Sequence, residues 1–138
     1  NLANGFSRLI MGYASDKINR TTGMSLTFLA AGLAYLVLPV VNELLPVALL
    51  ASIIGFAFGT LFAVSAPLAV DCFGLNNFGA IFGLIFTAYG FIAGILGPSL
   101  SGYLLDSSGS NFSIVFSYLG FFCLISSFLI RRVSPVVR

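Results

Sequence analysis

The chain has 138 residues, of which 59% are hydrophobic and 7% are charged, and its formal net charge is +2. Soluble domains carry about 25% charged residues, so this composition, with a mean hydropathy of +1.09, excludes a soluble globular protein. The sequence has no histidine, and its two cysteines, Cys72 and Cys123, lie far apart without a CxxC pattern. We therefore expect an all-α, polytopic membrane helix bundle that binds no metal and no cofactor.

Polar turns divide the chain into five apolar segments, the first of which is short. As a helix, residues 1–14 would cover roughly 21 Å, whereas the hydrocarbon core of a bilayer is about 30 Å thick. We therefore expect this segment to be part of a longer span in a larger protein. A charged loop over residues 15–23 follows it, with Asp16, Lys17 and Arg20.

Four further uncharged segments have the length and apolarity of membrane spans. They cover residues 24–41, 44–70, 78–105 and 113–130. Pro67 and Pro98 interrupt the second and third of these and favour a kink in each. Asp71 and Asp106 lie at span boundaries, where we expect them to cap helix ends or to stay solvated.

The basic residues predict the orientation. An even number of spans separates the loop at 15–23 from the basic C-terminal residues 131–138, which places both on one side of the membrane. Glu43 and Asp106 mark the other side, with no Lys or Arg beside them. By the positive-inside rule we expect the loop and the C-terminus to be cytoplasmic, in a multi-pass protein of the plasma membrane.

Small residues predict where helices pack closely. Three pairs of glycines are each spaced four residues apart, a pattern that places both members on one helix face. The six are Gly55, Gly59, Gly79, Gly83, Gly90 and Gly94.

The charged loop resembles a known family motif. Its pattern Gly12-x-x-x-Asp16-Lys17-x-Asn19-Arg20 is similar to the cytoplasmic loop of the major facilitator superfamily, Gly-x-x-x-Asp-Arg/Lys-x-Gly-Arg. We expect Gly12 to allow close helix contact, Asp16 to pair with a base or a helix N-terminus, and Asn19 to adopt the left-handed turn of the family's Gly. The family's motif follows the second helix of each six-helix half. Four spans follow it here, which implies the C-terminal half: part of helix 8 plus helices 9–12, with the N-terminal half as partner.

Two later stretches resemble one branch of that superfamily. Gly55-Phe56-Ala57-Phe58-Gly59, followed by Asp71 and Gly74, looks like helix 10 of the monocarboxylate transporter and oxalate:formate antiporter branch. Phe82-Gly83-Leu84, followed by Gly97-Pro98, Gly102, Leu105 and Asp106, looks like its helix 11. The resemblance implies a secondary active transporter that moves a small organic anion by alternating access.

The resemblance gives Arg8 and Asn4 a role. Arg8 matches the helix 8 position where monocarboxylate transporters place a substrate-binding arginine, and Asn4 lies one turn earlier, where some members carry a proton-coupling Asp. A guanidinium within a span costs on the order of 2.5–3.5 kcal/mol, so it should face a wet cavity or a partner. Its planar fork suits a carboxylate. Alternatively, Arg8 reaches the headgroups or pairs with an acid in the other half.

Four further residues are candidates for substrate contact. Thr87 and Tyr89 are polar residues midway along the span of residues 78–105, and Ser65 and Ala66 occupy the helix 10 region where the branch tunes substrate size. No Lys or Arg occurs between Arg20 and Arg131, so the second cation of oxalate carriers is missing and a monoanion is favoured. Protons and a counter-anion remain alternative coupling partners.

Two other functional classes compete with this interpretation. One is a major facilitator carrier of a non-carboxylate solute, and the other is a structural membrane subunit without transport activity. An enzyme is not expected, because the sequence has no His-Glu-x-x-His motif, no intramembrane Ser–Lys pair and no pair of buried aspartates. The chain also lacks nucleic-acid-binding motifs.

Overall fold

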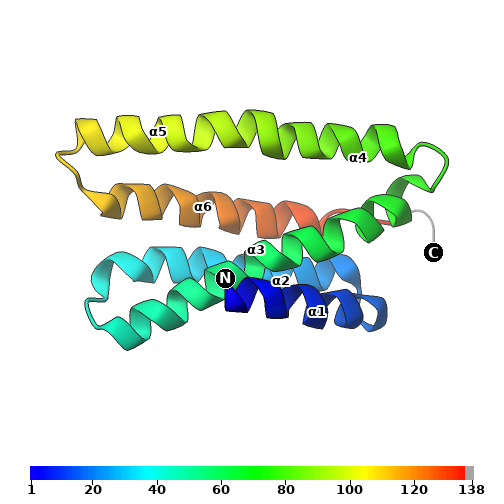
Figure 1. Cartoon of the computed structure of the whole chain (residues 1–138), viewed down its shortest axis with the longest axis horizontal. Helices are drawn as coiled ribbons and strands as arrows, with labels where there is room; N and C mark the ends of the chain where they lie inside the picture. Colours follow the sequence, from blue (N-terminus) through cyan, green and yellow to red (C-terminus); the bar gives the residue numbers. More distant parts are fainter. Residues whose placement is uncertain (136–138) are drawn as a thin grey trace.

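The structure of the chain, a computed structural model, describes residues 1–135 (Figure 1), and Arg138 of the predicted basic tail lies outside them. The described residues form helices and no strand, which confirms the predicted all-α fold. The elements are α1 (Leu2–Lys17), α2 (Arg20–Val37), a 3₁₀ turn η1 (Leu38–Val40), α3 (Leu44–Phe73), α4 (Phe78–Thr87), a π-helical turn η2 (Ala88–Ala93), α5 (Gly94–Ser107) and α6 (Phe112–Arg131).

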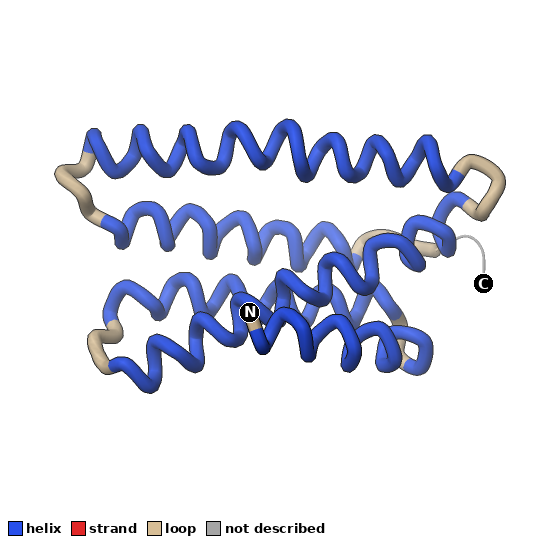
Figure 2. The backbone as a smooth tube through the Cα atoms, viewed as in Figure 1, coloured by secondary structure: helices blue, strands red, loops and turns tan. Residues whose placement is uncertain are grey.

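Four helical runs are long and apolar enough to cross a membrane. They cover Arg20–Val40, Leu44–Phe73, Phe78–Ser107 and Phe112–Arg131. Short connections separate them, and Figure 2 shows these loops gathered at the two ends of the bundle. We call the end that carries Lys17, Arg20 and Arg131 the basic end.

The predicted loop over residues 15–23 is wrong, because helix occupies most of it. α1 continues to Lys17 and α2 starts at Arg20, so that only Ile18 and Asn19 connect them. Asn19 does not adopt the expected left-handed conformation, since its φ is −55° and its ψ is 118°. Its side chain instead accepts a hydrogen bond from the Thr21 backbone N–H at 3.3 Å and caps α2.

The bundle divides into a packed part and one long rod (Figure 1). α2 packs against α3 and α6, and α1 packs against α3. The rod consists of α4, η2 and α5 in a continuous line, and it contacts α3 through α4 and α6 through α5. Among the described residues, none in the rod is buried. The rod therefore leaves most of its surface open to lipid or to further helices.

The contact between α2 and α6 depends on glycines that the sequence analysis did not select. A Cβ on Gly32 would lie 2.8 Å from Leu124 Cδ2 and 3.1 Å from the Gly120 oxygen, so a larger residue would force Leu124 or the two helices to shift. Seven residues from each glycine, Ser25 and Ser127 are buried, and each hydroxyl donates to the other residue's backbone oxygen at 2.9 and 2.7 Å. Small residues and paired hydroxyls thus hold the two helices together.

The contact between α1 and α3 depends on Gly59. A Cβ there would overlap Ser7 Oγ and the backbone oxygen of Asn4. Gly55, one turn away, would place its Cβ at an ordinary 3.9 Å from Ala3 Cβ. Gly59 therefore sets how closely α1 approaches α3, and with it the position of Asn4.

The other predicted packing glycines differ from Gly59. A Cβ on Gly79, Gly83 or Gly90 would meet nothing within 4 Å, and one on Gly94 would meet only the Tyr89 oxygen of its own span. The expected close contact at Gly12 is also missing within the described residues, because a Cβ there meets nothing within 4 Å. Contacts of these glycines with helices outside this chain stay a prediction.

Candidate functional site

Arg8 lies on α1 with one side of its guanidinium against α3. Its Cζ lies 4.9 Å from the centroid of the Phe62 ring, which is a cation–π contact. Its Nε donates to Asn4 Oδ1 at 3.1 Å, one helical turn away. For its two terminal nitrogens, the described part of the chain offers no hydrogen-bond or ion-pair partner. The edge of the guanidinium that suits a carboxylate is therefore unoccupied by protein groups.

Phe62 connects Arg8 to an aromatic cluster, which comprises Phe58, Phe62, Phe78, Phe82, Phe86 and Tyr89. The Tyr89 ring stands edge-on to Phe62 with the centroids 5.5 Å apart, and Phe58 does so at 5.1 Å. Phe82 and Phe86 continue the cluster along α4. Residues from α1, α3 and the rod thus meet at one place.

That place lies near the middle of the spans. Arg8 precedes the end of α1 by nine residues, which is roughly 14 Å of helix. Phe62 precedes the end of α3 by eleven residues, and Tyr89 follows the start of α4 by eleven, roughly 17 Å in each case. Half of a hydrocarbon core is about 15 Å, so the three side chains share a level close to its midplane.

The remaining predicted substrate residues lie outside the immediate contacts of Arg8. Thr87 is exposed, and its hydroxyl donates to the Gly83 backbone oxygen of its own helix at 2.9 Å. Ser65 and Ala66 are half-buried on α3, three and four residues after Phe62, on the same side of the helix. The Tyr89 hydroxyl has no hydrogen-bond partner among the described residues.

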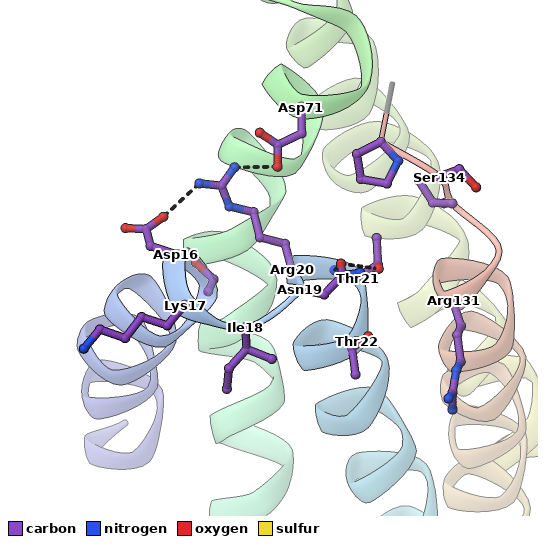
Figure 3. Close-up of a pocket in the computed structure, with 13 residues that line it drawn as sticks. Asp16, Lys17, Ile18, Asn19, Arg20, Thr21, Thr22, Asp71, Arg131 and Ser134 are labelled. Atoms are coloured by element: carbon purple, nitrogen blue, oxygen red, sulfur yellow. Dashed lines mark hydrogen bonds and ion pairs between the residues drawn. The ribbon is translucent and has the colours of Figure 1, made fainter. Parts of the chain in front are cut away.

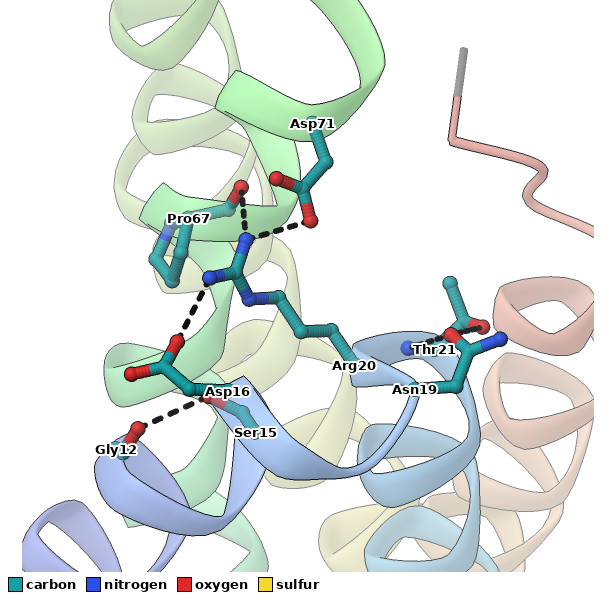
Figure 4. Close-up of polar contacts among 8 residues, drawn as sticks. All are labelled: Gly12, Ser15, Asp16, Asn19, Arg20, Thr21, Pro67 and Asp71. Carbon is teal, nitrogen blue, oxygen red and sulfur yellow. Dashed lines mark hydrogen bonds and ion pairs between the residues drawn. The ribbon is translucent and has the colours of Figure 1, made fainter. Parts of the chain in front are cut away.

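A second constellation occupies the basic end, where Arg20 joins three elements (Figure 4). One terminal nitrogen of Arg20 donates to Asp71 Oδ2 at 2.5 Å and to the Pro67 backbone oxygen at 3.3 Å. The other donates to Asp16 Oδ1 at 2.8 Å. The start of α2 is thereby tied to the end of α1 and to the last turns of α3.

Asp71 corrects the sequence analysis, which expected a helix cap or a solvated carboxylate. Its side chain is only 30% exposed and pairs with Arg20, whereas Asp16 is 67% exposed. The helix continues past it to Phe73, and Gly74 ends α3 with a φ of 75°, a conformation that glycine adopts without strain. The ion network lines an open polar crevice of about 790 Å³, to which Lys17 and Arg131 also contribute (Figure 3).

Sequence reasoning missed several residues of both constellations. Phe62 and Asp71 were not assigned to any site, although Phe58–Phe62 and Phe78–Phe82–Phe86 repeat at four-residue spacing, which stacks aromatic rings on one helix face. Of the predicted candidates, Asn4 contacts Arg8 directly, whereas Tyr89 is connected to Arg8 through the ring of Phe62.

The whole chain, residues 1–138, matches the family model of the Major Facilitator Superfamily. Neither the curated proteins nor the solved structures compared with the chain include a significant match. The family match agrees with the helical runs and with the charged motif between α1 and α2. The chain belongs to the Major Facilitator Superfamily, whose members are multi-pass membrane transporters that bind small solutes.

Proposed function

We propose that this chain is the C-terminal half-bundle of a secondary active transporter for a small organic anion, a monocarboxylate. Arg8 binds the carboxylate, and the half-bundle rocks against an N-terminal half so that the site opens to each side in turn. The basic end is cytoplasmic by the positive-inside rule. Protons or a counter-anion drive the movement.

The observation that carries this proposal is the environment of Arg8. A guanidinium at this depth costs on the order of 2.5–3.5 kcal/mol, a cost that a purely structural position near the end of a span would avoid. Phe62 covers one face and Asn4 holds Nε, so the orientation of the fork is constrained before a ligand arrives. A constrained, unpaired guanidinium edge is the arrangement that binds a carboxylate with two parallel hydrogen bonds.

The ion network supports the conformational part of the proposal. Arg20 ties α1, α2 and α3 together at the basic end, outside the apolar interior. Such a junction keeps α1, which carries Arg8, aligned with α3, which carries Phe62. Movement of the half-bundle would then carry the two together.

The test is uptake of labelled monocarboxylates, pyruvate, lactate and formate, into proteoliposomes that contain the full-length protein. Arg8→Ala and Arg8→Lys should each lower uptake at least about tenfold, because alanine removes the charge and lysine removes the planar fork. Arg132→Ala is the matched control, since Arg132 also stacks on an aromatic ring, that of Phe128 at 4.7 Å, but lies at the basic end. Its uptake should stay near that of the wild type.

Two results would contradict the proposal. Uptake that is equally sensitive to Arg8→Ala and Arg132→Ala would show that the loss is not specific to the site. Transport of a neutral or cationic solute, unchanged by Arg8→Ala, would favour a carrier of another solute class.

A further inference from the structure

We infer that the rod bends at its π-helical turn η2, so that α4 moves while α5 stays attached to α6. The rocking proposed above moves the half-bundle as one body. Bending at η2 adds a movement within the half-bundle, and its pivot carries Tyr89, whose ring contacts Phe62 beside Arg8. The inference goes beyond the proposed function, because it does not depend on which solute the protein carries.

The first argument is the backbone of the rod, in which two neighbouring places interrupt the regular helix. η2 spans Ala88–Ala93, where a wider turn replaces the α-helical hydrogen-bond pattern. Pro98 follows within α5 and has no N–H to donate to the Gly94 backbone oxygen. Sharp bends in helices occur at π turns and at prolines. This stretch is therefore where the rod bends at the lowest cost, although it is straight in the structure (Figure 1).

The second argument is the open space around the glycines of this stretch. A Cβ on Gly90 would meet nothing within 4 Å, and one on Gly94 would meet only the Tyr89 oxygen at 3.9 Å. Among the described residues, none in the rod is buried. Side chains of this chain therefore leave room for the backbone to change its angle at η2.

The third argument is that the two parts of the rod are attached to different helices by different interactions. α4 meets α3 through rings, with the centroids of Phe86 and Phe62 6.3 Å apart. α5 meets α6 through the Tyr118 hydroxyl, which contacts the Ser101 hydroxyl and donates to the Gly97 oxygen at 3.4 Å. Hydrogen bonds are directional, whereas aromatic pairs stay favourable over centroid separations of about 4.5–7 Å. We therefore take α5 as the fixed part and α4 as the moving part.

The size of the movement follows from the length of α4. Ala80 lies roughly 16 Å along the rod from the middle of η2. A bend of about 20°, the lower limit of a sharp kink, would displace it by about 5 Å. Because α4 starts at the basic end, directly after the loop that follows α3, the bend changes the width of the bundle at that end.

Distances between spin labels test the inference on the full-length protein in nanodiscs. A label at Phe121→Cys on α6 is paired with one at Ala80→Cys on α4 or at Tyr103→Cys on α5, since all three side chains are exposed. The native cysteines, Cys72 and Cys123 among them, are replaced by alanine. Without any ligand, the α4–α6 distance should spread over about 5 Å more than the α5–α6 distance. Rocking as one body would leave both distributions equally narrow.

Two matched double variants separate bending at η2 from other effects of glycine. Gly90→Ala with Gly94→Ala changes the turn, and Gly79→Ala with Gly102→Ala changes two glycines outside it. An added Cβ fits at all four positions, so both variants should fold. Alanine favours straight helix over glycine, so the displaced population should fall about five- to thirtyfold in the first variant. The control should keep the spread of the wild type.

The outcomes separate this inference from the proposed function. Equal spreads for the two label pairs would overturn bending, as would a spread that survives Gly90→Ala with Gly94→Ala or disappears equally in the control. If that double variant fails to fold, Gly90→Ala alone decides. A spread that collapses only when the turn is changed supports bending, even where uptake of monocarboxylates fails and the proposed function with it.

Discussion

Replacing Gly59 by alanine tests the structure most directly, because the same helix provides its own control. A methyl group at Gly59 would overlap Ser7 Oγ and the Asn4 backbone oxygen, whereas one at Gly55 would lie 3.9 Å from its nearest neighbour. A backbone oxygen cannot rotate away, so α1 and α3 must separate. We expect the free energy of unfolding to fall for Gly59→Ala and to stay level or rise slightly for Gly55→Ala.

The magnitude follows from two opposing effects. Overpacking a close contact costs typically about 1–3 kcal/mol, and a backbone obstacle places Gly59 at the upper end. Alanine in place of a mid-helix glycine gains about 0.5–1 kcal/mol in both variants, and this gain cancels when the two are compared. The two variants should therefore differ by about 3 kcal/mol.

The assay is denaturant unfolding of the full-length protein in detergent micelles, with pyruvate uptake measured in parallel. Uptake should fall for Gly59→Ala, because the separation of α1 from α3 moves Arg8 away from Phe62. Equal stabilities of the two variants would refute the predicted contact, as would a Gly55→Ala variant that loses more than Gly59→Ala.

Two further predictions concern the polar contacts. Ser25→Ala and Ser127→Ala should each cost about 0.6–1.7 kcal/mol of unfolding free energy, and the double variant should cost less than their sum because the hydroxyls share one contact; strict additivity would contradict the pairing. Asp71→Asn should cost about 1–2 kcal/mol, whereas Asp16→Asn, the exposed partner of Arg20, should cost under about 0.5 kcal/mol. The measurement is denaturant unfolding of both variants at the same salt concentration. A larger loss of unfolding free energy for Asp16→Asn than for Asp71→Asn would contradict the prediction and make Asp16 the stronger partner of Arg20.

The apolar spans were readable from the sequence because each requires a long run of uncharged residues. The ends of the helices were harder to predict from the sequence. Asp16, Lys17 and Arg20 read as a loop, since charged residues usually leave the bilayer, yet they continue α1 and start α2. Once Asn19 caps α2, a two-residue connection is enough, and the charges pair with one another at the helix ends.

Contacts between distant segments could not be predicted in the same way. The spacing Gly55–Gly59 and the spacing Gly79–Gly83 look identical in sequence, but within residues 1–135 only the first pair has another helix within 4 Å of an added Cβ. Likewise, the position of Arg8 indicated a binding role, while its contact with Phe62, 54 residues away, depends on how α1 and α3 rotate about their axes. The close approach of Gly59 on α3 to Ser7 on α1 fixes which helix faces meet. This contact between two distant residues cannot be read from the sequence around either one.

The π-helical turn η2 has a consequence for how one span serves two neighbours. In an uninterrupted α-helix, Gly97 would follow Phe86 by just over three complete turns and lie on nearly the same face. The extra residue of a π turn rotates everything after it by roughly 100°. Phe86 can therefore meet Phe62 of α3 while the Gly97 oxygen, at 3.4 Å, meets the Tyr118 hydroxyl of α6. One inserted residue thus gives a single membrane crossing two differently directed faces, one aromatic and one hydrogen-bonding.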